Sequence, residues 1–134
     1  MKIKIYLEGE TSAKKNSRVT DTRTGRSFPS ARYRNWEQEK ILEVRRQYQG
    51  DPFSGQAFVF LIFYHEDRRS RDSDHQVSSV FDMLKKAKVL KDDRWTLLPL
   101  HCVLNELADS AGCDVLIADD ARGVDEIIKG LCKR

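Results

Sequence analysis

Cysteine is scarce in this chain and follows no recognisable pattern. Its 134 residues include three cysteines, Cys102, Cys113 and Cys132, and no two of them form a C-x-x-C pair. An odd number without metal-type spacing argues against a disulfide framework, so we expect free thiols and a reducing compartment. Long apolar runs are missing too: none approaches the roughly 18 residues of a membrane span, and the N-terminus lacks the apolar core of a signal peptide. These absences predict a cytoplasmic protein without a membrane partner.

A large excess of charge of one sign is also absent. The formal net charge is +3, which by itself names no partner. Between Glu10 and Asn35, however, there are seven basic residues and only two acidic ones. The polar composition predicts a basic loop at about 8–29, and so long a connection in a small domain is usually functional or disordered. Hydrophobic residues make up 40% of the chain, enough for one core, so we predict a single domain spanning 1–134.

Hydrophobic patterns predict four strands. Polar and apolar residues alternate over 2–7, which is typical of a strand with one buried face. The run at 57–64 is apolar throughout, so we expect a central strand that is covered on both faces. Two further strands are predicted at 95–107 and 114–118, joined by a turn around 109–112.

Three helices are also expected. Ser30 is a candidate N-cap for the first. A second helix should begin at Ser73, which forms an S-x-x-Q capping box with Gln76, and should continue to about Lys88. A short amphipathic helix is predicted at about 121–131.

Four aspartates surround the second predicted helix. Asp72 and Asp74 lie at its start, and Asp92 and Asp93 follow its end. One interpretation is that the first pair only complements the helix dipole, worth roughly 0.3–1 kcal/mol per carboxylate. The other is a Mg²⁺ site with a third carboxylate, if the chain returns across the sheet to bring the second pair near Asp72. A calcium-binding EF-hand loop is excluded, because Val77 occupies its glycine position.

Two separated motifs occur in order along the chain. The first comprises K-K-N-S at 14–17 and P-S-x-x-Y-x-x-W at 29–36. The second comprises R-D-S-D at 71–74, followed by V-F-D-M-L and then by K-D-D at 91–93. Over about residues 2–119, this order resembles the RusA family of Holliday-junction endonucleases.

The resemblance implies an active site. Asp72, Asp74 and Asp93 match the family's catalytic carboxylates, which would hold Mg²⁺, with Mn²⁺ as a substitute. Two positions depart from the family pattern: His75 replaces an asparagine, and Ser78 replaces a catalytic lysine on the Asp74 face of the helix. Because serine carries no positive charge, we expect activity to be weakened, lost or rescued by another cation. The candidate auxiliary residues are His75, Lys85, Lys91 and Asp92, and Arg69 and Arg71 are further candidate cations.

The resemblance also implies an α+β fold, with a mixed β-sheet packed with helices in one RusA-like domain, and a symmetric homodimer. The implied function is Mg²⁺-dependent resolution of four-way DNA junctions in recombination and repair, by paired phosphodiester hydrolysis, in a bacterium or phage. Two alternatives stay open: a RusA-like protein that binds branched DNA without cutting it, and an interaction domain with no nucleic-acid role. We expect His65 and His101 to be structural. The expected DNA contacts are Lys14, Lys15, Arg18, Arg23, Arg26, Arg69 and Arg71.

Overall fold

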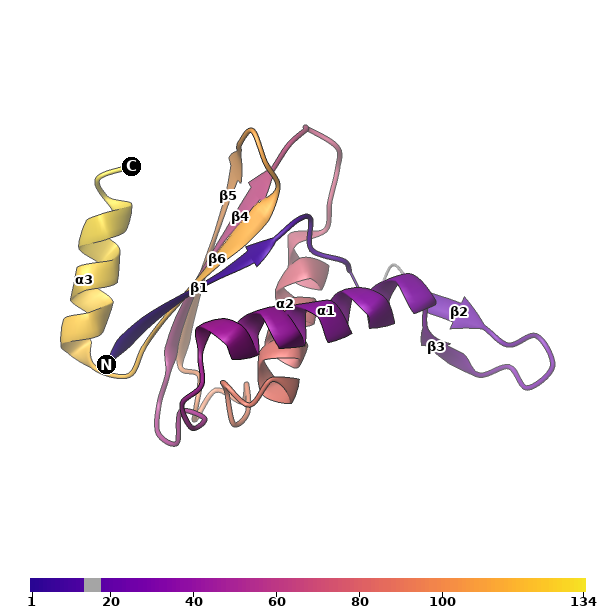
Figure 1. Ribbon diagram of the computed structural model, residues 1–134, viewed down its shortest axis with the longest axis horizontal. Coiled ribbons are helices and arrows are strands. Elements are labelled where there is room, and N and C mark those ends of the chain that lie inside the picture. The colour runs from indigo at the N-terminus through magenta and orange to yellow at the C-terminus, as the bar shows by residue number, and fades with distance from the viewer. Residues whose placement is uncertain (14–17) are drawn as a thin grey trace.

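A four-stranded mixed sheet forms the centre of the structure, a computed structural model that describes residues 1–13 and 18–134. The elements are β1 (Lys2–Glu8), β2 (Arg18–Thr20), β3 (Ser27–Pro29), α1 (Ala31–Gln47), β4 (Phe58–His65), α2 (Ser73–Lys86), β5 (Leu100–Leu107), β6 (Gly112–Ala118) and α3 (Ala121–Leu131). The sheet order is β1-β6-β4-β5 (Figure 1). β6 is antiparallel to β1 and β4, whereas β4 and β5 are parallel. Parallel neighbours need a crossover connection, and α2 supplies it.

Helices cover both faces of the sheet (Figure 1). Val59, Leu61 and Phe63 of β4 lie in the main core with the buried side chains of α1 and α2. Phe60 faces the other way and packs with Ile127 of α3. The predictions of a central, doubly covered strand and of a helix at 121–131 are therefore confirmed. Among the described residues, no helix combines the length and the apolar character needed to cross a membrane.

The predicted start of the first helix is confirmed, whereas the predicted end of the second is wrong. Ser30 is the N-cap of α1, and its Oγ accepts a hydrogen bond from the Tyr33 amide at 3.2 Å. Helix α2 ends at Lys86 rather than at about Lys88. Lys88 has a left-handed backbone conformation, with φ of 63°, which is incompatible with a further helical turn.

The predicted capping box of α2 does not form. Asp72, rather than Ser73, is the N-cap residue, and its side chain makes no capping hydrogen bond. Gln76 turns inward instead of toward the helix start: its Nε2 donates to Glu10 Oε1 at 2.9 Å and to the Thr11 carbonyl at 3.1 Å. Gln76 is buried, so these long-range partners outweigh the local cap that the sequence pattern predicts.

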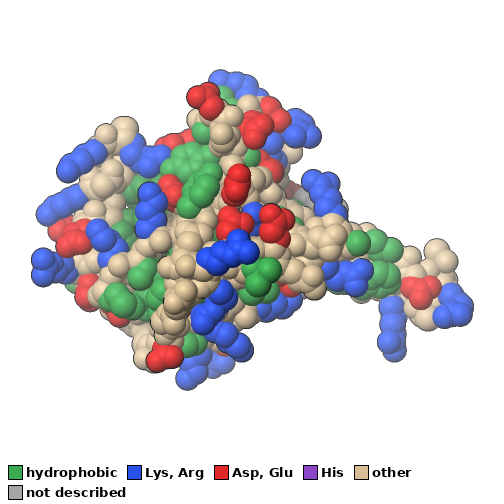
Figure 2. All heavy atoms as spheres, viewed as in Figure 1, with side chains coloured by type: hydrophobic (Ala, Val, Ile, Leu, Met, Phe, Trp, Pro, Cys, Tyr) green, Lys and Arg blue, Asp and Glu red, His purple; other side chains and the backbone are tan. Residues whose placement is uncertain are grey.

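A β-hairpin occupies part of the segment that we predicted as a loop. Strands β2 and β3 pair antiparallel, with Val19 opposite Phe28, and both of these apolar side chains are exposed. The connecting turn includes Gly25, which has a φ of 72° and donates its amide to the Asp21 carbonyl at 2.8 Å. The hairpin projects away from the body of the protein at the N-terminal end of α1 (Figure 1), and Figure 2 shows basic side chains on it.

The strand predicted from Trp95 is shorter than expected. Trp95 lies in a turn, and β5 begins only at Leu100. The Leu97 and Leu98 amides both donate to the Arg94 carbonyl, at 2.9 and 2.8 Å, so the backbone is curled where a strand would be extended. This turn places Trp95 at the surface beside the acidic pair.

Candidate functional site

An open groove of about 540 Å³ lies between α2, the segment that follows it and β5. We call it the α2 groove; it is lined by residues 73, 74, 77, 78, 81, 93, 95, 98, 101 and 103. Asp74, Ser78 and Phe81 contribute to it together because residues spaced by three and four positions share one face of a helix. Two of the three candidate catalytic carboxylates, those of Asp74 and Asp93, therefore line the same groove.

Asp72 lies at the same end of α2 as Asp74 but lines a different hollow. That hollow has a volume of about 320 Å³ and includes Glu10, Arg69 and Arg71 among its lining residues. The Asp72 side chain is 68% exposed, and its Oδ2 lies 3.4 Å from His75 Nδ1. His75 is therefore an immediate neighbour of this carboxylate.

Asp93 contacts the C-terminal end of α2. Its Oδ1 accepts a hydrogen bond from Lys85 Nζ at 3.2 Å, and Lys85 lies 3.4 Å from Asp82 as well. Partial burial lowers the pKa of Lys85, but the hydrogen bond and the charges of these two aspartates outweigh that effect, so its pKa is raised. Lys85 thus remains a cation against Asp93.

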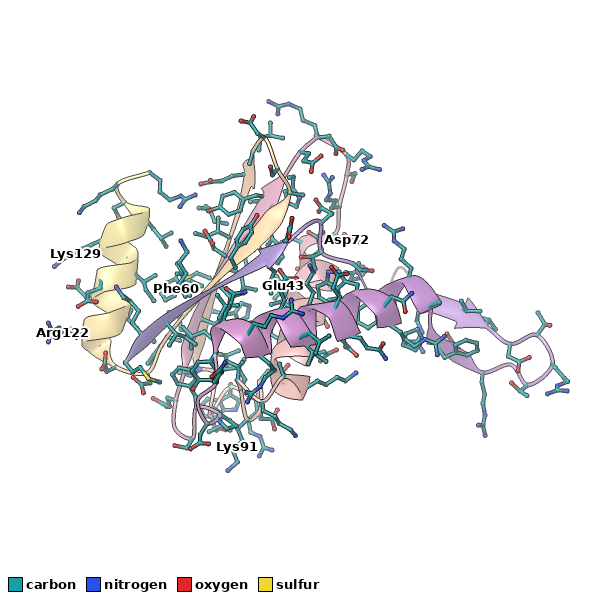
Figure 3. All side chains as sticks on the ribbon, in the orientation of Figure 1. Glu43, Phe60, Asp72, Lys91, Arg122 and Lys129 are labelled. Carbon is teal, nitrogen blue, oxygen red and sulfur yellow. The ribbon has the colours of Figure 1, made fainter. Side chains whose placement is uncertain are left out.

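The second acidic pair follows the end of α2 opposite Asp72, so the condition for a shared site is met only in part: Asp93 lines the α2 groove with Asp74, whereas Asp72 lines another hollow. A 14-residue helix is about 21 Å long, and Figure 3 shows Asp72 and Lys91 near its two ends. The segment after α2 is held where it is by the pairing of Leu90 with Phe53, whose amide donates to the Val89 carbonyl at 3.0 Å. The chain turns there and enters β5 from the far end.

Asp92 supports the local backbone. Its Oδ1 accepts the Asp93 amide at 2.7 Å, and its Oδ2 lies 2.7 Å from Arg94 Nη2. The Arg94 hydrogen bond and that amide hold the pKa of Asp92 at about 2. Asp92 therefore stays ionised and orients its neighbour.

The donor chemistry of the site suits a hard cation, although its carboxylates do not cluster. Within residues 1–13 and 18–134, no three His, Cys, Asp or Glu side chains form a group that could hold a metal ion. Mg²⁺ usually takes one or two carboxylates and completes its coordination with substrate phosphates. Asp74 and Asp93 line one groove, and Asp72, two residues before Asp74, lines the neighbouring hollow. The oxygen donors that Mg²⁺ prefers are therefore present at the N-terminal end of α2 and in the α2 groove.

The candidate DNA-binding residues fall into three groups. Lys14 and Lys15 lie outside the described residues. Arg18, Arg23 and Arg26 are exposed on the hairpin. Arg69 is 80% exposed and paired with Asp67. The Arg71 side chain is only 16% exposed, and it contacts Glu10 and Asp67 at 2.9 and 2.8 Å. Both partners of Arg71 belong to this chain, so these contacts stabilise the loop before α2.

Sequence reasoning missed Glu10, which joins three segments beneath the acidic end of α2. Its Oε1 lies 2.9 Å from His65 Nδ1, from Arg71 Nε and from Gln76 Nε2. His65 Nε2 also lies 2.9 Å from Asn105 Oδ1, which supports the predicted structural role of this histidine. No sequence signal identifies Glu10, because its partners are distant along the chain.

Trp95 was missed as well. It is 79% exposed and lines the α2 groove beside Asp93. Its place directly after a D-D-R run was the only available signal. His101, predicted to be structural, packs edge-on against Phe81, with ring centres 5.3 Å apart, and lines the same groove.

Comparison with known proteins agrees with the motif order. The family model described as "Endodeoxyribonuclease RusA" matches residues 8–118. The crossover junction endodeoxyribonuclease RusA of Aquifex aeolicus (strain VF5) is 33% identical over 101 residues, which is 75% of this chain and 79% of the relative. The residues that the family model matches, 8–118, include the hairpin, both acidic pairs and the α2 groove. The chain belongs to the RusA family.

Proposed function

We propose that this protein is a structure-specific endodeoxyribonuclease that resolves four-way (Holliday) DNA junctions by paired cuts in recombination and repair. The observation that carries the proposal is the family match over residues 8–118, together with a relative named a crossover junction endodeoxyribonuclease. The α2 groove adds physical support, because it brings Asp74 and Asp93 to one open surface.

Asp72, Asp74 and Asp93 are the proposed catalytic carboxylates. Asp72 and Asp74 would hold Mg²⁺, or Mn²⁺ in its place, together with substrate phosphate oxygens. The bound ion would supply an activated water and neutralise charge on the scissile phosphate. Asp93 and Lys85 would meet the same DNA strand farther along the groove. Asp92 would fix the backbone of Asp93 through the 2.7 Å amide contact.

The projecting hairpin is the proposed grip on the DNA backbone. Arg23 and Arg26 are exposed and form no ion pair with the part of the chain that the structure describes, so their charges are available to phosphates. Four further basic residues would add to this contact: Lys14, Lys15, Arg18 and Arg69. Lys91 is exposed near the end of α2 that lies opposite Asp72 (Figure 3). Binding through phosphates weakens steeply as salt rises.

A symmetric homodimer would match the symmetry of the substrate. A four-way junction presents equivalent strands, and a two-fold dimer presents equivalent sites to them. Each subunit would then supply one α2 groove and one basic hairpin for one of the paired cuts.

A second candidate is a RusA-like protein that binds branched DNA without cutting it. The observation in its favour is Ser78, which lines the α2 groove where the family resemblance places a catalytic lysine. Lys85 is the cation in contact with Asp93, and cleavage would depend on whether its charge serves in place of that lysine.

Cleavage of a labelled four-way junction with Mg²⁺, beside a linear duplex of the same sequence, tests the proposal. Wild type should produce paired nicks near the crossover, and EDTA or Asp74→Asn should abolish them while binding persists. Tight junction binding without nicks would favour the non-cutting alternative. Absence of any salt-dependent DNA binding would favour an interaction domain.

A further inference from the structure

Trp95 is a highly exposed aromatic side chain that lines the α2 groove. Its 79% exposure is the largest among the exposed large hydrophobic residues of the described chain, whereas the other tryptophan, Trp36, is 8% exposed. An indole has a large apolar area, and leaving that area in water is unfavourable compared with burying it against a partner. An exposed Trp beside candidate catalytic groups is therefore suited to a ligand that covers it.

The groove beside Trp95 has an apolar floor. Val77 and Phe81 of α2, Leu98 of the turn and Val103 of β5 all line it. Its volume of about 540 Å³ lies within the roughly 300–1,000 Å³ of small-ligand sites. A flat, largely apolar ring system would be covered on one side by the indole and on the other by this floor.

Polar groups surround that floor. Ser78 and His101 can hydrogen-bond in either direction, and Asp93 offers carboxylate oxygens. Carboxylates accept hydrogen bonds from the exocyclic amino groups of bases, whereas they repel a bare phosphate. Lys91 and Arg94, both exposed, stand beside this rim. The arrangement suits a base against Trp95 and Asp93, with the scissile phosphate at Asp74, where the proposed function places Mg²⁺.

We propose that the α2 groove is a nucleobase-binding subsite, in which an unstacked base beside the cleaved strand stacks on Trp95. This inference rests on the proposed function, because the base would belong to the DNA held by the same acidic groove. Base–aromatic stacking is tolerant of sequence and requires an unpaired base. Base pairs at a junction crossover lack a continuous stack, so a base there costs less to unstack than one within continuous duplex, and Trp95 would discriminate branched from linear DNA.

Tryptophan fluorescence provides a direct test. In a Trp36→Phe variant, Trp95 is the remaining tryptophan, and its emission should be that of an exposed indole. Without Mg²⁺, addition of a four-way junction should quench this emission, and linear duplex should quench it much less. Junctions with 2-aminopurine next to the cleavage position should report the same contact from the DNA side.

Variants of Trp95 supply the second readout. Trp95→Ala should weaken junction binding about 10-fold, the change expected for one lost base–aromatic stack, and Trp95→Phe should restore most of it. Leu42→Ala is the matched control, because Leu42 is 60% exposed on α1 and should leave binding unchanged. Thermal unfolding of each variant should match wild type, since the replaced side chains are exposed.

Three outcomes would overturn the inference. If wild type binds and cuts junctions but neither quenching nor the Trp95→Ala effect is seen, the subsite is wrong and the proposed function stands. If Trp95→Ala changes the sedimentation coefficient, a second copy of the chain covers the groove. If wild type neither binds nor cuts junctions, the proposed function and the subsite fail together.

Discussion

Lys85 Nζ lies 3.2 Å from Asp93 Oδ1, so the last turn of α2 supplies a cation to the acidic pair that follows it. Both side chains are about one-third exposed, at 31% and 37%, and exposed pairs of this kind add little to stability. A charge held against a candidate catalytic carboxylate therefore matters more for electrostatics at the groove than for folding.

Lys85→Met should lower the single-turnover rate of junction cleavage by about 10- to 100-fold, because it removes the positive charge held against Asp93. Junction affinity should change by less than about 3-fold, since one of several cations is lost. Lys129→Met is the control: Lys129 pairs with Asp125 on α3, on the far side of the sheet (Figure 3). An unchanged cleavage rate would remove Lys85 from the mechanism.

Ser78→Lys should raise the cleavage rate by about 10-fold or more. The new ammonium group would enter the α2 groove, which Ser78 lines together with Asp74, and would stabilise negative charge that develops on the phosphate. Ser54→Lys adds the same charge in the exposed loop before β4 and should have no such effect. Equal rates for the two variants would argue against a charge requirement at position 78.

Replacing Arg23 and Arg26 together by Gln should weaken junction binding and flatten its salt dependence. The slope of log K against log salt should fall in magnitude by up to about 2, since each phosphate contact contributes roughly 0.9. Arg122→Gln is the control, because Arg122 is 89% exposed on α3. Titrations at several salt concentrations give the slopes, and parallel lines for wild type and the double variant would place DNA away from the hairpin.

Tyr33→Phe should destabilise the fold by about 1–3 kcal/mol, because a buried charged acceptor loses its donor. Tyr33 Oη donates to Glu37 Oε2 at 2.7 Å, and both residues are buried. Burial and this contact raise the pKa of Tyr33, so it donates throughout the ordinary pH range. Urea unfolding should show the loss, whereas Tyr6→Phe, at a 39% exposed side chain, should change little. Lys86 Nζ donates to the other carboxylate oxygen of Glu37 at 2.6 Å, and equal midpoints would show that this contact alone satisfies Glu37.

Asp67→Asn should destabilise the protein at pH 6 and have little effect at pH 2. Backbone and side-chain hydrogen bonds from Arg69 and Arg71 lower the pKa of Asp67 from 3.8 to about 2. A lowered folded-state pKa means that the carboxylate stabilises the fold above its unfolded pKa, and this contribution is lost as the pH falls through about 2. Unfolding free energies measured across this range test the sign. Asp125→Asn on α3 is the comparison, and an equal effect of Asp67→Asn at both pH values would contradict the linkage.

Much of the fold could be predicted because it depends on local signals. Ser30 caps α1 with its own side chain. The apolar run of β4 can be buried on both faces only in the middle of a sheet that is covered on both sides. The N-cap of α2 is Asp72 rather than Ser73, and Gln76 binds Glu10 instead of closing the predicted capping box. That partner comes from a different part of the chain, and no local pattern contains it.

The candidate site was predictable in composition but not in arrangement. Asp74 and Ser78 share a groove because helical spacing requires it. The position of Asp93 depends on the pairing of Phe53 with Leu90, which joins two loops distant in sequence. Trp95 is exposed because a turn replaces the first residues of a predicted strand, and that turn is set by backbone hydrogen bonds to Arg94.

The pairing of β1 with β6 joins residues 2–8 to residues 112–118. During synthesis, the first strand to leave the ribosome therefore has no neighbour in its sheet until almost the whole chain has been made. Contacts so distant in sequence slow folding, because the intervening loop must close before they form. A chain interrupted before β6 would leave β1 unpaired and β4 without one of its neighbours, so productive folding of the sheet has to wait for the C-terminal third of the protein.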